Sequence, residues 1–119
     1  MSLALRAGQI VIADWRDAMP KEPNRLRPAI VVEDSELFDP GYPSVVLVPL
    51  TEDARLGIPD LSVPILPTPA NGCSKPCFAL ATHVTATAKS RIRPTESAIT
   101  PDQLADIRAR IGIALGLGA

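Results

Sequence analysis

A short polar segment near the N-terminus concentrates the side chains with the greatest chemical potential. Lys21, Glu22, Arg25 and Arg27 lie within seven residues, in a connection too long for a simple hairpin. Pro28 restricts the backbone of Arg27 to an extended conformation, which fixes the point from which the guanidinium starts. A planar guanidinium matches the oxygens of a phosphodiester and the extra charge of a pentacovalent transition state. The pattern indicates phosphate or carboxylate binding, with a solvated surface arginine as the alternative.

Four further side chains are candidates for chemistry. Thr51 directly follows the apolar run Val45–Leu50, so its hydroxyl ends a predicted strand, where threonine commonly makes only a turn hydrogen bond. His83 is the sole histidine and ordinarily titrates near neutrality. The alternative for His83 is a packed core residue. Trp15 is expected either to stack on an unpaired base or to cover the end of the fold, and Tyr42 is a second aromatic side chain that could stack on a base.

The two cysteines of the chain, Cys73 and Cys77, do not form a convincing metal site. Structural zinc takes four ligands, and only His83 is available to join them. Two cysteines also do not suggest a secreted disulfide scaffold. We therefore expect free thiols, no metal and no cofactor.

The elements that must position these residues are mostly strands. Short runs rich in β-branched residues, separated by polar turns, are typical of a small barrel. The predicted strands are Gln9–Asp14, Pro28–Glu33, Val45–Leu50, Ser62–Leu66 and Phe78–Val84. Pro49 implies a sheet edge or a bulge near the end of the third strand.

The C-terminus predicts the one clear helix. Thr100 is an N-cap residue, proline follows at the first helical position, and Gln103 completes a capping box. Leucine and isoleucine side chains recur at helical spacing from Leu104 to Leu115, and Gly116 ends the helix.

The net charge of −1 hides a strong segregation. Residues 31–62 carry seven acidic side chains against one arginine, whereas residues 63–95 carry four basic side chains and no acidic one. A polyanion can therefore meet a local basic face on an acidic chain. Lys89, Arg91 and Arg93 would join the basic loop in such a face, or would only solvate their own loops.

Length and composition set the remaining limits. A chain of 119 residues fits one compact domain, and 46% apolar residues supply a core, so we expect a single domain over residues 1–119. No apolar run approaches the roughly 20 residues that span a bilayer. The segment Met1–Gly8 is too short for a signal peptide. These features predict a cytoplasmic protein with no membrane partner.

Three stretches of the chain resemble one known family. Gly8–Asp14, Arg27–Val32 and Val48–Thr51 are similar to the opening strands of the MazF/PemK toxins, and the arginine–proline pair that opens the second stretch is the most specific part. The resemblance implies a mainly β fold with a C-terminal helix, a small SH3-like β-barrel of the MazF/CcdB type. It also implies a homodimer that cleaves single-stranded RNA without a metal, leaving 2′,3′-cyclic phosphate and 5′-hydroxyl ends.

The resemblance also assigns catalytic roles by position. Arg27 matches the family's catalytic arginine and is suited to stabilising the phosphorane. Thr51 matches the catalytic threonine and would hydrogen-bond a non-bridging oxygen. Glu22 matches a glutamate of the polar loop and His83 a glutamine of the late strand. Glu22 and His83 are the candidates for the proton transfers.

Binding partners follow from the same resemblance. Lys21, Arg25 and Trp15 are the candidate contacts to single-stranded mRNA. A cognate antitoxin with an acidic, flexible segment is expected to pair its carboxylates with these cations.

The chain departs from the family at several positions, namely Lys21, Pro23, Leu80, Thr82 and Thr85. Some members carry a late arginine and aspartate that this chain lacks, which favours an alternative without catalysis. That alternative is a protein-binding toxin of the gyrase-poison type on the same fold, or an inactive member. The pairing of Arg27 with Thr51 favours the nuclease.

Overall fold

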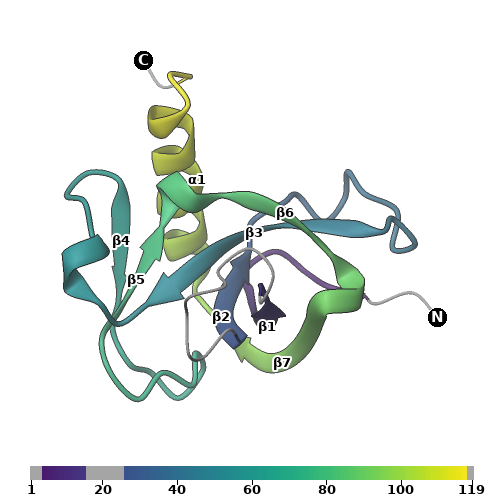
Figure 1. Ribbon diagram of the computed structural model, residues 1–119, viewed down its shortest axis with the longest axis horizontal. Coiled ribbons are helices and arrows are strands. Elements are labelled where there is room, and N and C mark those ends of the chain that lie inside the picture. The colour runs from purple at the N-terminus through teal and green to yellow at the C-terminus, as the bar shows by residue number, and fades with distance from the viewer. Residues whose placement is uncertain (1–3, 16–25, 118–119) are drawn as a thin grey trace.

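The computed structural model describes residues 4–15 and 26–117. Its elements, which Figure 1 shows, are β1 (Gln9–Asp14), β2 (Leu26–Val31), β3 (Ser44–Thr51), the 3-10 helix η1 (Ala54–Leu56), β4 (Ser62–Ile65), β5 (Cys77–Leu80), η2 (Ala81–His83), β6 (Thr85–Ala88), η3 (Lys89–Arg91), β7 (Ile92–Ala98) and α1 (Pro101–Ala114). The expected fold class, mainly β with one C-terminal helix, is confirmed.

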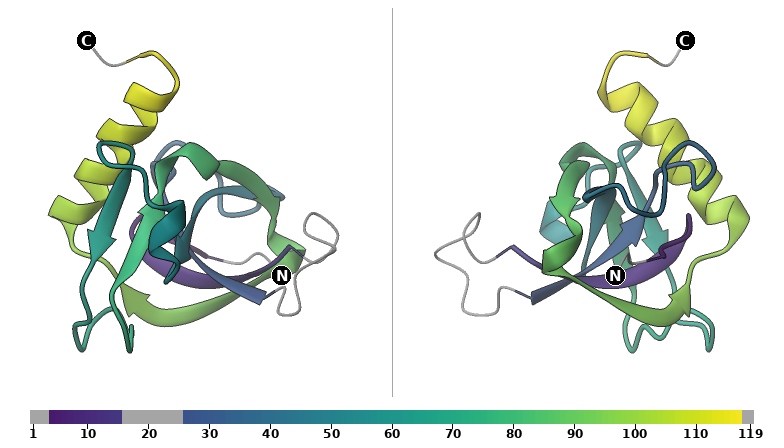
Figure 2. Two further views of the ribbon diagram at one scale, coloured as in Figure 1. Left: turned by 60° about the vertical axis from the view of Figure 1, so that its left-hand side comes forward. Right: turned by 90° about the vertical axis from the view of Figure 1, so that its right-hand side faces the viewer.

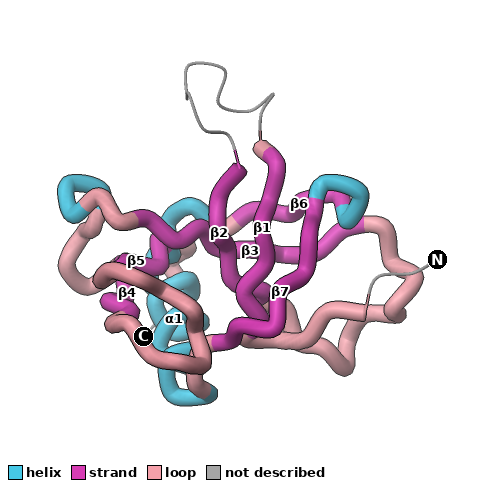
Figure 3. Tube along the Cα trace, turned by 90° about the horizontal axis from the view of Figure 1, so that it is seen from below, coloured by secondary structure: helices cyan, strands magenta, loops and turns pink. Residues whose placement is uncertain are grey.

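All strand pairs are antiparallel, and the order in the sheet is β4-β5-β3-β2-β1-β7. Strand β6 pairs with the first half of β3, on the side where β5 pairs with its last two residues. The strand β3 therefore has two partners on one side, and the sheet forks there. Figure 3 shows β2, β1 and β7 side by side on the other side of the fork.

The sheet does not close into a barrel, which corrects the sequence prediction on this point. Although η3 connects β6 directly to β7, the described residues form no ladder between these two strands. β6 is only four residues long and β7 contains Pro94, which has no N–H to donate. Arg93 and Glu96 are exposed on β7, and charged side chains protect an edge strand from further pairing.

Both faces of the central strands are buried, which explains their nearly continuous apolar sequences. One face packs against β4, β5 and α1 through a cluster that includes Ile30, Val48 and Ile107. The opposite face carries a second cluster that includes Val31 and Leu47. Neighbouring residues along a strand therefore belong to different cores, as the alternation of side chains requires.

The helix α1 begins with the predicted capping box. The Thr100 hydroxyl accepts a hydrogen bond from the Gln103 amide at 3.1 Å, and the Gln103 side chain accepts one from the Thr100 amide at 2.9 Å. Ile107 is fully buried, whereas Leu115 is 60% exposed because the C-terminal end of the helix projects beyond the sheet (Figure 2). Within the part of the chain that the structure describes, no helix is long and apolar enough to cross a membrane.

Two predictions about the strands are wrong. The predicted strand Phe78–Val84 ends at Leu80, and the chain then turns through η2, so His83 lies in a 3-10 turn instead of a strand. The strands β6 and β7 were not predicted, because their sequences, TATA and IRPTESA, lack the apolar alternation of a half-buried strand.

Candidate functional site

The fork in the sheet contains a cavity of about 430 Å³. Its walls come from the ends of β2, β3 and β5, from η1 and η2, and from β6 and η3. The lining residues are Trp15, Arg27, Pro49, Leu50, Thr51, Leu56, Leu80, His83, Thr85, Ala86, Thr87, Ala88 and Arg91. Four residues predicted from the sequence, Trp15, Arg27, Thr51 and His83, therefore line one cavity.

Strand register explains why Arg27 and Thr51 meet. Ala29 of β2 lies opposite Pro49 of β3. Arg27 and Thr51 each lie two residues further, towards the same end of the strand pair, and on the same face as this pair. The strand β2 begins at Leu26, so Arg27 lies inside a strand instead of in the loop before it. Its guanidinium starts from a fixed backbone on the same rim as the Thr51 hydroxyl.

The Thr51 side chain is only 8% exposed and is held by a turn. Its Oγ1 accepts a hydrogen bond from the Asp53 amide at 3.1 Å, which confirms the turn bond expected for a threonine at a strand end. This bond uses an oxygen lone pair, so the hydroxyl hydrogen can still donate towards the cavity.

The same turn orients one wall of the cavity. The Asp53 carboxylate accepts hydrogen bonds from the Arg55 amide and guanidinium, each at 3.0 Å. The side-chain hydrogen bond from Arg55 holds the pKa of Asp53 below its usual value. These contacts cap η1, whose Leu56 lines the cavity beside Thr51.

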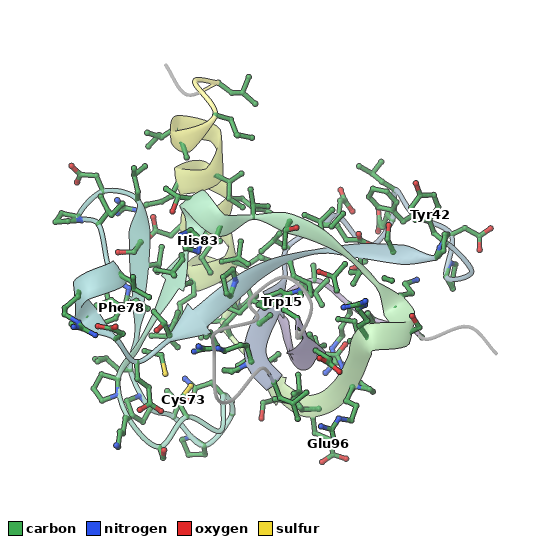
Figure 4. The ribbon with its side chains drawn as sticks, in the orientation of Figure 1. Trp15, Tyr42, Cys73, Phe78, His83 and Glu96 are labelled. Carbon is green, nitrogen blue, oxygen red and sulfur yellow. The ribbon has the colours of Figure 1, made fainter. Side chains whose placement is uncertain are left out.

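The Trp15 indole is fixed by a side chain of β6. Its Nε1 donates to the Thr87 hydroxyl at 3.0 Å, and Thr87 is only 5% exposed. The indole also packs against the core cluster that contains Val31 and Leu47. The ring is therefore a rigid wall of the cavity, and Figure 4 shows it lying over the curved sheet.

His83 and Arg91 complete the polar lining. His83 is exposed on η2 and lines the cavity, so its alternative reading as a packed core residue is wrong. Arg91 donates from Nη1 to the Asp14 carbonyl at 3.5 Å and supplies a second guanidinium to the lining. Arg91 belongs to the segment 63–95, which carries no acidic residue, and the sequence had made it a candidate for a basic face.

Other candidate residues lie elsewhere. Lys89 donates from Nζ to the Pro40 carbonyl at 3.0 Å and, like Arg93, is not among the lining residues. Tyr42 packs on Phe38, with 5.5 Å between ring centroids. Figure 4 places Tyr42 at the far end of the molecule from His83.

The residues Lys21, Glu22 and Arg25 lie outside the described residues. Among the lining residues that the structure describes, none carries a carboxylate and His83 is the one with an imidazole, a group that can both accept and donate a proton. His83 is therefore the proton carrier that the described lining offers.

Apolar side chains make up much of the cavity lining, which sequence reasoning missed. Pro49 and Leu50 come from β3, Leu56 from η1 and Leu80 from β5, and no local pattern brings these three elements together. With two arginines beside them, these side chains give the cavity an apolar wall and a cationic rim, which suit a planar base and its phosphate.

No metal centre is formed by the described residues: they contain no cluster of three or more His, Cys, Asp or Glu side chains placed to hold an ion. Cys73 and Cys77 are both free thiols. They lie at a second cavity, which is described below.

Comparisons with known proteins agree with this architecture. Residues 6–115 match the family model described as PemK-like, MazF-like toxin of type II toxin–antitoxin system. A comparison with curated protein sequences gives no match.

Solved structures give the same picture. MazF from Deinococcus radiodurans is 26% identical, with a TM-score of 0.75 over 96% of this chain and 98% of that one. The Mycobacterium tuberculosis toxin MazF-mt6 is 20% identical, with a TM-score of 0.74 over 93% of this chain and 99% of that one. A mycobacterial endoribonuclease in complex with its cognate antitoxin is 19% identical, with a TM-score of 0.67 over 98% of this chain and 97% of that one. The last two likenesses bear on the fold alone.

Proposed function

This chain belongs to the PemK-like, MazF-like toxins of type II toxin–antitoxin systems, and from that premise we propose that it is an endoribonuclease that cleaves single-stranded mRNA without a metal. The observation that carries the proposal is the meeting of Arg27, Thr51 and His83 at one cavity of about 430 Å³. A relative of the same fold is itself described as an endoribonuclease.

In the proposed reaction the 2′-hydroxyl of the RNA attacks the neighbouring phosphorus. A base removes the proton from the 2′-oxygen, and an acid protonates the departing 5′-oxygen, leaving a 2′,3′-cyclic phosphate and a 5′-hydroxyl. His83 and Glu22 are the proposed proton carriers. His83 suits either role, because a neutral imidazole nitrogen can accept a proton and an imidazolium can donate one.

The remaining residues act on charge and position. Arg27 stabilises the two negative charges of the phosphorane, and its planar fork can bond two oxygens at once. Thr51 donates its hydroxyl hydrogen to a non-bridging oxygen. Trp15 stacks on an unpaired base, while Lys21 and Arg25 contact flanking phosphates.

The direct test is cleavage of a long single-stranded RNA by the purified protein in EDTA. We expect discrete fragments with 5′-hydroxyl ends. Arg27→Ala should lower turnover by several orders of magnitude, because an aimed positive charge is lost at the transition state. Arg93→Ala is the matched control: it removes the same side chain from an exposed position outside the cavity, and it should cleave normally.

Two outcomes would redirect the proposal. Intact RNA from a protein that still arrests growth would favour the non-enzymatic, protein-binding mechanism. Unchanged turnover in a folded Arg27→Ala protein would remove Arg27 from the mechanism.

We also propose that a cognate antitoxin occupies the same cavity. A mycobacterial endoribonuclease has been solved in complex with its cognate antitoxin, and the Deinococcus MazF has been solved with MazE. An acidic, flexible segment would pair carboxylates with Arg27 and Arg91 and would insert apolar side chains between Leu56 and Leu80. RNA and antitoxin should then compete, and Arg27→Glu should weaken both. An antitoxin that binds Arg27→Glu at full strength while RNA binding is lost would place the inhibitor elsewhere.

Finally, we propose a symmetric homodimer with RNA bound along both subunits. The apolar residues of β3 belong to the protein's own core, whereas Ile113 and Leu115 at the end of α1 are 53% and 60% exposed. Sedimentation should show a dimer at micromolar concentration, and a monomer over that range would refute this assembly.

A further inference from the structure

A second cavity, of about 260 Å³, lies on the other side of the β3 end from the candidate site. Thr51, the last residue of β3, lines the first cavity, and Glu52, which directly follows it, lines the second. Leu50 contributes to both. The end of β3 therefore forms a thin wall between the two cavities.

Both thiols of the chain line this second cavity. Cys77 is the first residue of β5, lies opposite Ile65 of β4 and is 7% exposed. Cys73 lies half-buried in the loop that leads to β5 and packs against the same core cluster. Figure 4 shows the Cys73 sulfur near the start of β5.

The Cys77 thiol is hard to ionise. Burial, and after it the neighbouring Cys73 side chain, raise the pKa of the Cys77 thiol to about 11. Cys77 Sγ also donates to the Lys75 carbonyl at 3.4 Å, and Cys73 Sγ donates to the Asn71 carbonyl at 3.8 Å. Neither described sulfur is held by a metal cluster or a disulfide.

The loop around Cys73 is pre-ordered by a buried amide. The Asn71 side chain is 4% exposed, and its Oδ1 accepts from the Thr68 amide at 3.0 Å and from the Cys73 amide at 2.9 Å. Its Nδ2 donates to the Leu66 carbonyl at 2.8 Å. These bonds fix the backbone of Cys73 at the wall of the cavity that Cys77 also lines.

We propose that Cys73 and Cys77 are a thiol–disulfide exchange site that takes a low-molecular-weight disulfide. The Cys73 thiolate attacks one sulfur of the small disulfide, forming a mixed disulfide and releasing one small thiol. The Cys77 thiolate then attacks the Cys73 sulfur, forming the intramolecular bond and releasing the second small thiol. The protein loses two electrons and two protons, and the small disulfide is reduced to two thiols.

The order of the two steps follows from exposure. Cys73 is the more accessible sulfur and faces the open cavity, so it meets the small disulfide first. Cys77 is buried and its thiolate is disfavoured, so the second step is the slow one at neutral pH. The inference is independent of the proposed RNA cleavage.

The test is alkylation of the folded protein after incubation with oxidised glutathione. Since the chain has only two cysteines, the count of alkylated thiols is unambiguous by intact mass. We expect the wild-type mass to fall by two hydrogens and the oxidised protein to accept no alkylating group. After addition of dithiothreitol, both cysteines should be alkylated again. Conversion should speed up as the pH rises towards 11.

Single variants separate the two sulfurs. Cys77→Ser should stop at one glutathione adduct on Cys73, formed at nearly the wild-type rate. Cys73→Ser should form its adduct on Cys77 far more slowly. Wild type that keeps two alkylatable thiols, that accumulates a stable glutathione adduct, or that gives disulfide-linked dimers would each overturn the proposal.

Discussion

The hydrogen bond between Trp15 and Thr87 gives a direct test of how the site is held. Thr87→Val preserves the shape of the side chain but removes the oxygen that accepts from Trp15 Nε1 at 3.0 Å. Leaving a buried donor without a partner costs about 1–3 kcal/mol. Because Trp15 is only half-buried, we expect a loss of about 1–2 kcal/mol in the free energy of unfolding.

The matched control is the same substitution two residues earlier. Thr85 also belongs to β6 and lines the same cavity, but it is exposed, and its hydroxyl donates only to the neighbouring Ala86 carbonyl at 3.5 Å. Thr85→Val should change the free energy of unfolding by less than about 0.5 kcal/mol.

Urea unfolding followed by fluorescence measures both effects. Trp15 is the only tryptophan in the chain, so the emission reports on the cavity wall itself. With a slope of about 1–3 kcal/mol per M, Thr87→Val should lower the urea midpoint by about 0.3–2 M and shift the native emission to the red. Equal midpoints and emission maxima for the two variants would show that the bond to Thr87 does not hold the indole.

Three further measurements test other parts of the structure. Arg91→Ala should lower cleavage about 100-fold if its guanidinium meets the phosphorane, with Arg93→Ala as the unaffected comparison. Ile107→Ala should cost about 2–5 kcal/mol of stability in urea, because the side chain is fully buried, whereas Ile113→Ala, at a position 53% exposed, should cost little. The raised pKa of Cys77, about 11 against 9.0, means that the folded state holds its proton longer than the unfolded state. Stability in reducing buffer should be constant below pH 9 and fall by at most about 3 kcal/mol between pH 9 and 11, and this fall should be absent in Cys77→Ala.

The sequence predicted the parts of the fold that local chemistry decides. The capping box at Thr100 fixes the start of α1, and the apolar runs of β1, β2 and β3 appear as strands within two residues of their predicted starts. These segments are buried on both faces, so their composition alone identifies them. Edge strands such as β6 lack that signature, because their partners and not their own residues make them strands.

The residues of the candidate site also differ in how well the sequence identifies them. Thr51 was found because it ends an apolar run, and Arg27 because Pro28 after it marks a predicted strand start, although Arg27 lies inside β2. His83 was identified but was placed in a strand. Nothing in the apolar run before it shows that β5 ends at Leu80 and that the 3-10 helix η2 follows. The apolar walls at Leu56 and Leu80 depend on contacts between distant turns, and no spacing rule reaches that far.

The fork in the sheet has a consequence for how such a site can change. The amide of Val32 donates to the Val46 carbonyl, so Val32 and Val46 form a hydrogen-bonded pair. Hydrogen-bonded and non-hydrogen-bonded pairs alternate along an antiparallel ladder. The backbone of Pro49 therefore points away from β2, towards the side where β5 and β6 pair with β3. A proline there has no N–H to present on that side. Substituting Pro49 would add one backbone donor to the cavity without altering a ladder. Lengthening the turn Ala81–His83 would spread β5 from β6 while leaving the β2–β3 pairs intact. Such changes at the fork can therefore alter which ligand the cavity prefers while the hydrophobic core stays unchanged.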